Sequence, residues 1–238
     1  MNATAIVPVR TSATMLAMTI QLPETIEVEP GTRPESAILW LHGLGADGHD
    51  FEAVVPELRL PERLAVRFVF PHAPVRPVTI NAGMRMRAWY DILQLGGGPE
   101  DEAGIRASQK LLEGLLEREV ARGIAPQRIV VAGFSQGGAI ALQTGLRYPE
   151  RLAGVLALST YLPLAGALPA ERSDANRKVP IFQAHGRFDD LIPIERAARS
   201  RDALQALDYP MEWHEYPMPH SVCAEEIADI AGWLTRVL

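Results

Sequence analysis

The chain has 238 residues, of which 47% are hydrophobic and 22% charged. This is the composition of a globular domain, and it excludes a disordered, collagen-like or coiled-coil protein. With 23 Lys and Arg against 29 Asp and Glu, the net charge is −6, and the chain lacks the basic footprint of a nucleic-acid binder. The single cysteine, Cys223, excludes an internal disulfide and a cysteine-built zinc site. We therefore expect a cytoplasmic protein.

The N-terminal segment is open to two interpretations. Arg10 followed by the apolar run Ala13–Ile20 resembles a weak signal peptide, but two threonines interrupt the run and no clear cleavage site follows. We interpret residues 1–18 as a loose tail or an extended translation start. Residues 19–238 are then expected to form a single domain, with no apolar run of the ~18 residues that an integral membrane segment needs.

Short apolar runs alternate with amphipathic stretches along the remaining chain. The runs expected as strands are Ala37–Leu41, Leu64–Phe70, Arg128–Ala132, Leu152–Leu158, Val179–Ala184 and Met211–Tyr216. The stretches expected as helices are Asp101–Arg122, Gln136–Tyr148, Ile194–Leu207 and Ser221–Val237. This alternation predicts an α/β fold with a mostly parallel sheet, to which Thr19–Leu22 and Thr25–Glu29 add an antiparallel edge. Ligands bind at the carboxyl ends of such strands.

A Gly-x-Ser-x-Gly motif occupies residues 133–137, between the run that ends at Ala132 and the next helical stretch. The flanking glycines permit a sharp turn that projects the Ser135 hydroxyl above the sheet. The following helix directs free amide hydrogens and the positive end of its dipole to the same place. We therefore predict that Ser135 is a nucleophile.

A serine nucleophile needs a base, and the base needs an orienting acid that precedes it in the chain in enzymes with this turn. Three histidines follow Ser135. His214 falls inside an expected strand, and His185 comes too early to follow the acid. His220 lies in the loop before the last helix, and we predict that it is the base.

Two adjacent aspartates, Asp189 and Asp190, follow the expected strand Val179–Ala184. Adjacent side chains diverge, so only one carboxylate can reach the imidazole. The other would cap the helix that starts near Pro193. The residues alone leave both assignments open.

A second oxyanion donor is expected in the glycine-rich loop after the strand Ala37–Leu41. The backbone amides of Leu44 and Gln136 are the two candidates. The histidines outside the predicted site have no ligand spacing on one element, so we expect no metal and no other cofactor.

The segment between Pro71 and Pro99 is long for an ordinary loop and contains Trp89. We interpret Trp89 as a wall of an acyl pocket, the alternative being an ordinary core position. Ile192, beside the candidate acid, is expected to contact substrate as well. The chain has little room for a large lid, which favours esters of short to medium acyl chains.

Taken together, the motifs at residues 41–47, 89–91, 133–138 and 185–189, with His220, resemble the phospholipase/carboxylesterase family of α/β-hydrolases. This is the acyl-protein thioesterase-like branch, which includes small bacterial carboxylesterases. The resemblance implies an α/β-hydrolase fold with helices flanking a mostly parallel sheet and no large cap domain. It selects Asp189 as the acid and places the oxyanion amides at Leu44 and Gln136.

The resemblance further implies a serine hydrolase that cleaves carboxylic esters or thioesters through an acyl-enzyme intermediate. Its substrate is a small-molecule ester or an acylated molecule, and several family members are dimers, which makes a homodimer an expectation. The alternatives are a lysophospholipase, a peptidase or acyltransferase using the same triad, and a non-catalytic scaffold. A peptidase of this fold usually has an additional domain, and a scaffold is expected to lack a triad member.

Overall fold

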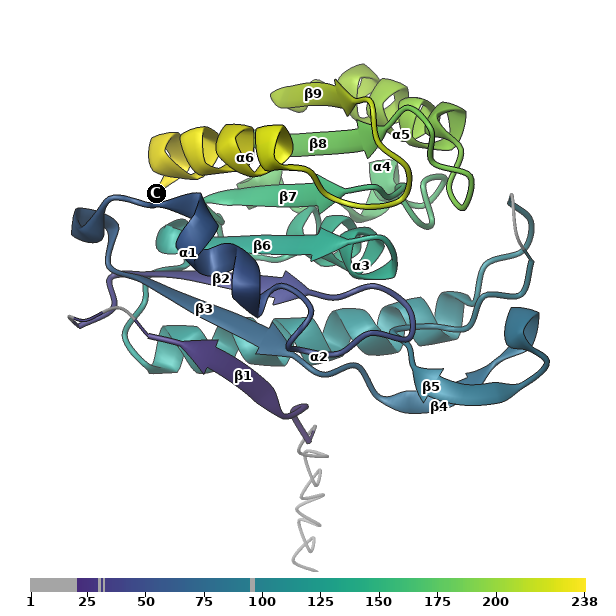
Figure 1. Cartoon of the computed structure of the whole chain (residues 1–238), viewed down its shortest axis with the longest axis horizontal. Helices are drawn as coiled ribbons and strands as arrows, with labels where there is room; N and C mark the ends of the chain where they lie inside the picture. Colours follow the sequence, from purple (N-terminus) through teal and green to yellow (C-terminus); the bar gives the residue numbers. More distant parts are fainter. Residues whose placement is uncertain (1–20, 30, 32, 95–96) are drawn as a thin grey trace, which may run out of the picture.

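The computed structural model describes residues 21–29, 31, 33–94 and 97–238. A seven-stranded sheet forms its centre, in the order β1-β3-β2-β6-β7-β8-β9 (Figure 1). Its strands are β1 (Thr25–Val28), β2 (Ser36–Leu41), β3 (Val66–Pro71), β6 (Ile129–Phe134), β7 (Gly154–Leu158), β8 (Ile181–Gly186) and β9 (Met211–Tyr216). Every neighbouring pair is parallel except β1 and β3, which are antiparallel. The expected α/β-hydrolase architecture is confirmed, and the predicted tail 1–18 lies outside the described residues.

Helices cover both faces of this sheet (Figure 1). They are α1 (Val55–Leu58), α2 (Glu102–Ala121), α3 (Gln136–Gly145), α4 (Leu168–Glu171), α5 (Ile194–Ala206) and α6 (Ala224–Val237). The core on one face contains residues of α2, α3, α4 and α5, and the core on the other contains residues of α1 and α6. Because both faces are covered, a central strand such as β2 is buried along its whole length, which explains its uninterrupted apolar sequence.

The long helix α2 shows how the sequence sets these boundaries. The Asp101 Oδ1 atom accepts a hydrogen bond of 2.9 Å from the Gly104 N–H and so caps the first turn. The apolar stripe from Ile105 to Leu116 packs into the core. Beyond the last turn, Gly123 has a φ of 97°, a left-handed conformation that glycine adopts without a steric cost.

A two-stranded hairpin stands apart from the main sheet within the 71–99 segment (Figure 1). It consists of β4 (Val75–Val78) and β5 (Met84–Arg87), which pair antiparallel. Its strands have four residues each, a proline interrupts the first, and the alternation in the second is too short to predict a strand. Short 3₁₀ helices occur at Glu52–Val54, Glu62–Leu64, Thr79–Asn81, Pro126–Arg128 and Asp174–Asn176.

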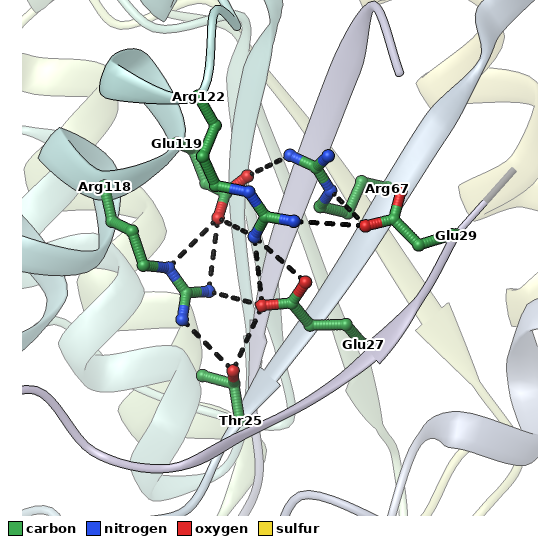
Figure 2. Close-up of polar contacts among 7 residues, drawn as sticks. All are labelled: Thr25, Glu27, Glu29, Arg67, Arg118, Glu119 and Arg122. Atoms are coloured by element: carbon green, nitrogen blue, oxygen red, sulfur yellow. Dashed lines mark hydrogen bonds and ion pairs between the residues drawn. The ribbon is translucent and has the colours of Figure 1, made fainter. Parts of the chain in front are cut away.

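An ion-pair network fastens β1 and β3 to α2 (Figure 2). Its members are Thr25, Glu27, Glu29, Arg67, Arg118, Glu119 and Arg122. At its centre, the fully buried Glu119 accepts hydrogen bonds from Arg67 at 2.7 Å and from Arg122 at 3.0 Å. Burial opposes ionisation of Glu27, but Arg122 and Arg118 outweigh it and lower the pKa of that carboxyl. The network thus joins the antiparallel edge of the sheet to the helix layer.

Candidate active site

The Gly-x-Ser-x-Gly motif forms a tight turn between β6 and α3. Ser135 has φ 54° and ψ −120°, a strained conformation for a residue other than glycine. Its N–H donates to the Leu158 carbonyl at 2.8 Å, and its carbonyl accepts from the Thr160 hydroxyl at 2.6 Å. A Cβ atom on Gly137 would lie 2.3 Å from the Leu41 carbonyl oxygen, so only glycine fits there. The surrounding structure therefore holds Ser135 in a conformation that presents its side chain at the sheet edge.

Asp189 and His220 meet at the carboxyl end of β8. The His220 Nδ1 donates a 2.6 Å hydrogen bond to Asp189 Oδ2. The Asp189 Oδ1 atom accepts from the backbone N–H groups of Leu191 at 3.0 Å and Ile192 at 2.8 Å. Because Nδ1 carries the proton that faces the carboxylate, Nε2 of His220 is left free to accept one. This is the arrangement that a general base requires.

His185 lies fully buried behind the same carboxylate. Its Nε2 atom is 2.8 Å from the Ile192 carbonyl oxygen, to which it donates, and 3.2 Å from Asp189 Oδ2. Burial opposes ionisation of Asp189, but the hydrogen bonds from His185, His220 and the Ile192 N–H outweigh it. The pKa of Asp189 is therefore far below its usual range, and the carboxylate stays ionised.

The neighbouring Asp190 is exposed. The expectation that the second aspartate caps the next helix is wrong, because the residue at that cap is Pro193 and no side chain bonds to the helix start. The Asp189 carboxylate itself accepts the N–H groups of the turn before the helix, while its other oxygen faces His220. Asp189 therefore orders the turn before α5 with one oxygen and bonds His220 with the other, and the helix itself has no side-chain cap.

The loop after β2 presents the backbone N–H of Leu44, and α3 begins with that of Gln136. Within the described part of the chain, neither N–H donates a hydrogen bond. His42 holds this loop in place, since its Nε2 accepts from the Ala73 N–H at 3.0 Å and its Nδ1 donates to the Gly43 carbonyl at 2.7 Å. Burial lowers the pKa of His42 to about 4, so the ring is neutral.

Trp89 ties the two loops together. Its indole Nε1–H donates to the His42 carbonyl at 2.9 Å. Its backbone N–H donates to Oε1 of the Gln136 side chain at 2.7 Å. The Gln136 amide in turn donates to the Tyr90 carbonyl at 2.6 Å. Trp89 is 1% exposed and does not line the active-site cavity, contrary to its interpretation as a pocket wall. Its contacts fit the core alternative.

A cavity of about 400 Å³ opens between these elements. Its lining consists of Gly43, Leu44, Ala46, Asp50, Ile80, Asn81, Tyr90, Ile92, Gln94, Phe134, Ser135, Gln136, Tyr161, Leu191, Ile192, Arg196 and His220. The fold brings together here five residues that the sequence predicts, namely Leu44, Ser135, Gln136, Ile192 and His220. The roles of Tyr90, Tyr161 and Arg196 in this wall were not predicted. Tyr161 follows the end of β7, so the rule that ligands bind at strand ends was the available signal.

No group of three or more His, Cys, Asp or Glu side chains in residues 21–29, 31, 33–94 and 97–238 is placed to hold a metal ion. In the same ranges, no helix is long and apolar enough to cross a membrane. The arrangement instead provides a hydroxyl on a strained turn, a buried Asp–His pair and two unbonded amides. On this doubly covered sheet, these features define the α/β-hydrolase class.

Comparison with known proteins identifies the family within this class. The family model for phospholipase/carboxylesterase matches residues 23–238. Acyl-protein thioesterase 1 of Mycosarcoma maydis is 42% identical over 233 residues, which is 90% of this chain and 97% of that protein. Acyl-protein thioesterase 1 of Gibberella zeae is 39% identical over 213 residues, with 85% and 91% covered.

Solved structures of similar sequence also match this chain over most of its length. Acyl-protein thioesterase 2 of Zea mays superimposes with a TM-score of 0.79 at 30% identity, covering 90% of this chain and 99% of that one. Arabidopsis thaliana SOBER1 gives a TM-score of 0.81 at 32% identity, with 85% and 98% covered. The chain belongs to the phospholipase/carboxylesterase family, and it is a serine hydrolase that cleaves esters or thioesters.

Proposed function

We propose that Ser135 is the nucleophile, His220 the general base and Asp189 the orienting acid, with the amides of Leu44 and Gln136 as the oxyanion hole. The observation that carries this assignment is the convergence on one cavity of Ser135, two unbonded N–H groups and a histidine bonded to a buried carboxylate. This is the set of groups that acyl transfer through a serine requires.

In the first half-reaction, the Ser135 Oγ attacks the carbonyl carbon of the ester or thioester while His220 Nε2 takes the hydroxyl proton. Asp189 stabilises the imidazolium that forms. The negative charge moves to the carbonyl oxygen, where the N–H groups of Leu44 and Gln136 donate to it. Collapse of this intermediate expels the alcohol or thiol, which receives its proton from His220, and leaves an acyl-serine ester.

In the second half-reaction, a water molecule attacks the acyl-serine carbonyl and gives its proton to His220 Nε2. The same two amides stabilise the second oxyanion. Its collapse breaks the bond to the Ser135 Oγ, which recovers the proton from His220. The products are a carboxylic acid and the free enzyme, so no cofactor takes part.

The cavity indicates the kind of acyl group. Apolar side chains such as Ile80, Ile92, Leu191 and Ile192 form much of its lining, which suits an acyl chain of short to medium length. The relatives named acyl-protein thioesterases favour thioesters of acylated molecules alongside small-molecule esters. We also propose that the protein is a homodimer, which the family resemblance supports. The single cysteine supports a location in the cytoplasm.

Turnover of p-nitrophenyl butyrate and labelling by a fluorophosphonate probe test the nucleophile. Ser135→Ala is expected to lower kcat by about 10⁴-fold or more and to abolish labelling, because no other hydroxyl occupies the turn. Cys223→Ala, which removes the single thiol of the chain, is the control and should be labelled like the wild type. Substantial turnover by a folded, pure Ser135→Ala protein would contradict the assignment.

A further inference from the structure

The active-site cavity has a polar corner beside the apolar side chains of its acyl wall. There the hydroxyl oxygens of Tyr90 and Tyr161 lie 2.9 Å apart and share a hydrogen bond. The Arg196 guanidinium stacks on the Tyr161 ring, with its Cζ atom 3.4 Å from the ring centroid. All three residues line the cavity that contains Ser135. The catalytic steps proposed above use none of them.

The charge of Arg196 is not neutralised by a neighbouring side chain. No carboxylate in the described ranges lies within 4.0 Å of its guanidinium, whereas Arg147 is ion-paired with Glu171 at 2.7 Å. Glu100 lines an adjoining crevice with Arg196, but its carboxylate accepts the Leu164 N–H at 3.0 Å. Arg196 therefore has no ion-pair partner among the described residues, although the Glu100 carboxylate is a nearby negative charge.

Helix stability does not explain this arginine either. Arg196 lies in the first turn of α5, a helix of 13 residues. The positive end of the helix dipole lies at that turn, where an anionic side chain is favoured and a cationic one is disfavoured. The dipole and the guanidinium therefore add to a positive potential on this side of the cavity.

The corner also has hydrogen-bond donors to spare. A guanidinium stacked on a ring keeps its in-plane N–H groups available, and this fork fits a carboxylate or a phosphate. One of the two tyrosine hydroxyls donates the hydrogen bond that they share, so the proton of the other hydroxyl is available for a ligand. Burial raises the pKa values of Tyr90 and Tyr161, so both stay protonated and can donate.

One carboxylate, Asp50, also lines the cavity. Desolvation raises its pKa, and the charge of Asp47 raises it further. Asp50 is exposed, so solvent and salt screen its charge from a bound anion.

We propose that Arg196, with the Tyr90–Tyr161 pair, is a binding site for an anionic group of the substrate. The enzyme then favours esters or thioesters that carry a carboxylate or phosphate several bonds away from the scissile carbonyl. This inference rests on the proposed function, because it needs the scissile bond at Ser135 and the anion at Arg196 in one cavity.

The test compares two matched substrate pairs by kcat/KM. One pair is mono-p-nitrophenyl adipate with p-nitrophenyl hexanoate, and the other is hexanoyl glycerol phosphate with glycerol monohexanoate. The wild type should show a lower KM for the anionic member of at least one pair, and the pair that responds identifies the carboxylate or the phosphate. The readout is the anionic-to-neutral ratio, which cancels general effects on the catalytic machinery.

Arg196→Gln should lower this ratio about tenfold to a hundredfold, the range expected for a charge-assisted hydrogen bond. Arg196→Lys should lower it less, because the charge stays and the planar fork is lost. Tyr161→Phe keeps the stacked ring and should lower it about threefold. Arg199→Gln, an exposed arginine of the same helix, is the matched control and should leave the ratio unchanged.

An unchanged ratio in folded Arg196→Gln and Tyr161→Phe proteins would overturn the anion site. It would leave the proposed function standing as long as the wild type hydrolyses p-nitrophenyl hexanoate. A wild type that hydrolyses none of the four esters would instead contradict the proposed function. Melting temperatures of all variants establish that they are folded.

Discussion

Two buried carboxylates, at the β1–α2 edge and at the end of β8, have contrasting partners. Glu119 is surrounded by permanent cations, since Arg67, Arg118 and Arg122 all lie within 3.2 Å of its oxygens (Figure 2). Asp189 has two histidines and two backbone N–H groups and no arginine or lysine ion pair within the described ranges. Both carboxylates are desolvated, and both have hydrogen-bond partners on each oxygen.

The difference lies in whether a proton can move. The three arginines around Glu119 stay protonated at any ordinary pH, so that edge has a fixed charge distribution suited to stability. In the mechanism that we propose, the His220 ring beside Asp189 changes its charge during the reaction, and the carboxylate stabilises the charged form. Removing each carboxylate should therefore affect a different property: catalysis at Asp189 and folding stability at Glu119.

Asp189→Asn should lower kcat by about 10³–10⁴-fold and change the melting temperature little. The asparagine oxygen can still accept the N–H groups of Leu191 and Ile192. Its amide would face His220 Nδ1, favour the wrong tautomer and fail to stabilise the imidazolium. Steady-state kinetics on a p-nitrophenyl ester, with circular dichroism for folding, measure both properties.

The adjacent Asp190→Asn is the matched control. Asp190 is exposed, so the kcat of the Asp190→Asn protein should differ from the wild-type value by no more than about threefold. If Asp190→Asn is the crippled protein, the acid is misassigned. If both variants retain activity, the acid comes from another strand end.

Glu119→Gln should show the opposite pattern. Arg67 is 8% exposed, and loss of the charge beside it leaves a buried cation poorly compensated. Breaking a buried pair in this way costs about 3–5 kcal/mol of the free energy of unfolding. Urea unfolding measures this, while kcat of the folded fraction should stay near the wild-type value.

Glu117→Gln, an exposed glutamate on the same helix, is the control and should change stability by less than about 0.5 kcal/mol. A Glu119→Gln protein as stable as this control would show that the network adds nothing to folding. A Glu119→Gln protein that is stable but slow would show that the edge and the site are coupled.

Much of the fold could be predicted from local sequence patterns. Every expected central strand is present, because the parallel sheet is covered on both faces and its strands are predominantly apolar. The hairpin β4–β5 was not predicted, since a proline interrupts β4 and the apolar–polar alternation of β5 extends over only four residues. The ion-pair network was not predicted either, because its directly bonded side chains lie up to 95 residues apart in sequence.

The candidate site likewise contains residues that the sequence predicts and residues that it does not. Ser135 and His220 lie in motifs whose spacing and order predict them, and the fold brings them to one cavity. The placement of Trp89 was not predictable, because an apolar residue in a long segment gives no sign of whether it faces a cavity or the core. Arg196 belongs to no motif, and its position depends on how α5 packs against the Tyr161 loop.

A third buried carboxylate, Glu226 on α6, extends the comparison because it lacks what the other two have. It is fully buried, and neither oxygen has a hydrogen-bond partner of normal geometry in the part of the chain that the structure describes. Burial raises the pKa of Glu226 to about 8, the Cys223 N–H opposes this in part, and the charge of Asp229 adds to it. Without a cation or a full set of donors, this group is buried in its neutral form at neutral pH.

Glu226→Gln should therefore stabilise the protein in a pH-dependent way. The folded-state pKa lies above the unfolded value of 4.5, so the folded state keeps its proton while the unfolded chain releases it. The wild type is fully stable with respect to this group below pH ~4.5 and loses stability as the pH rises towards about 8. Glutamine mimics the protonated acid and has no proton to lose, so the variant escapes this loss.

The expected difference in unfolding free energy between Glu226→Gln and the wild type is small at pH 5. It should grow to about 2–3 kcal/mol in favour of the variant at pH 8. This growth is shallower than the slope of ~1.4 kcal/mol per pH unit that a site without structural relaxation would give. Urea unfolding at pH 5, 6.5 and 8 measures the trend, with the exposed Glu225→Gln as the matched control. A Glu226→Gln difference that stays constant across these pH values would mean that Glu226 ionises in the folded protein as it does in water.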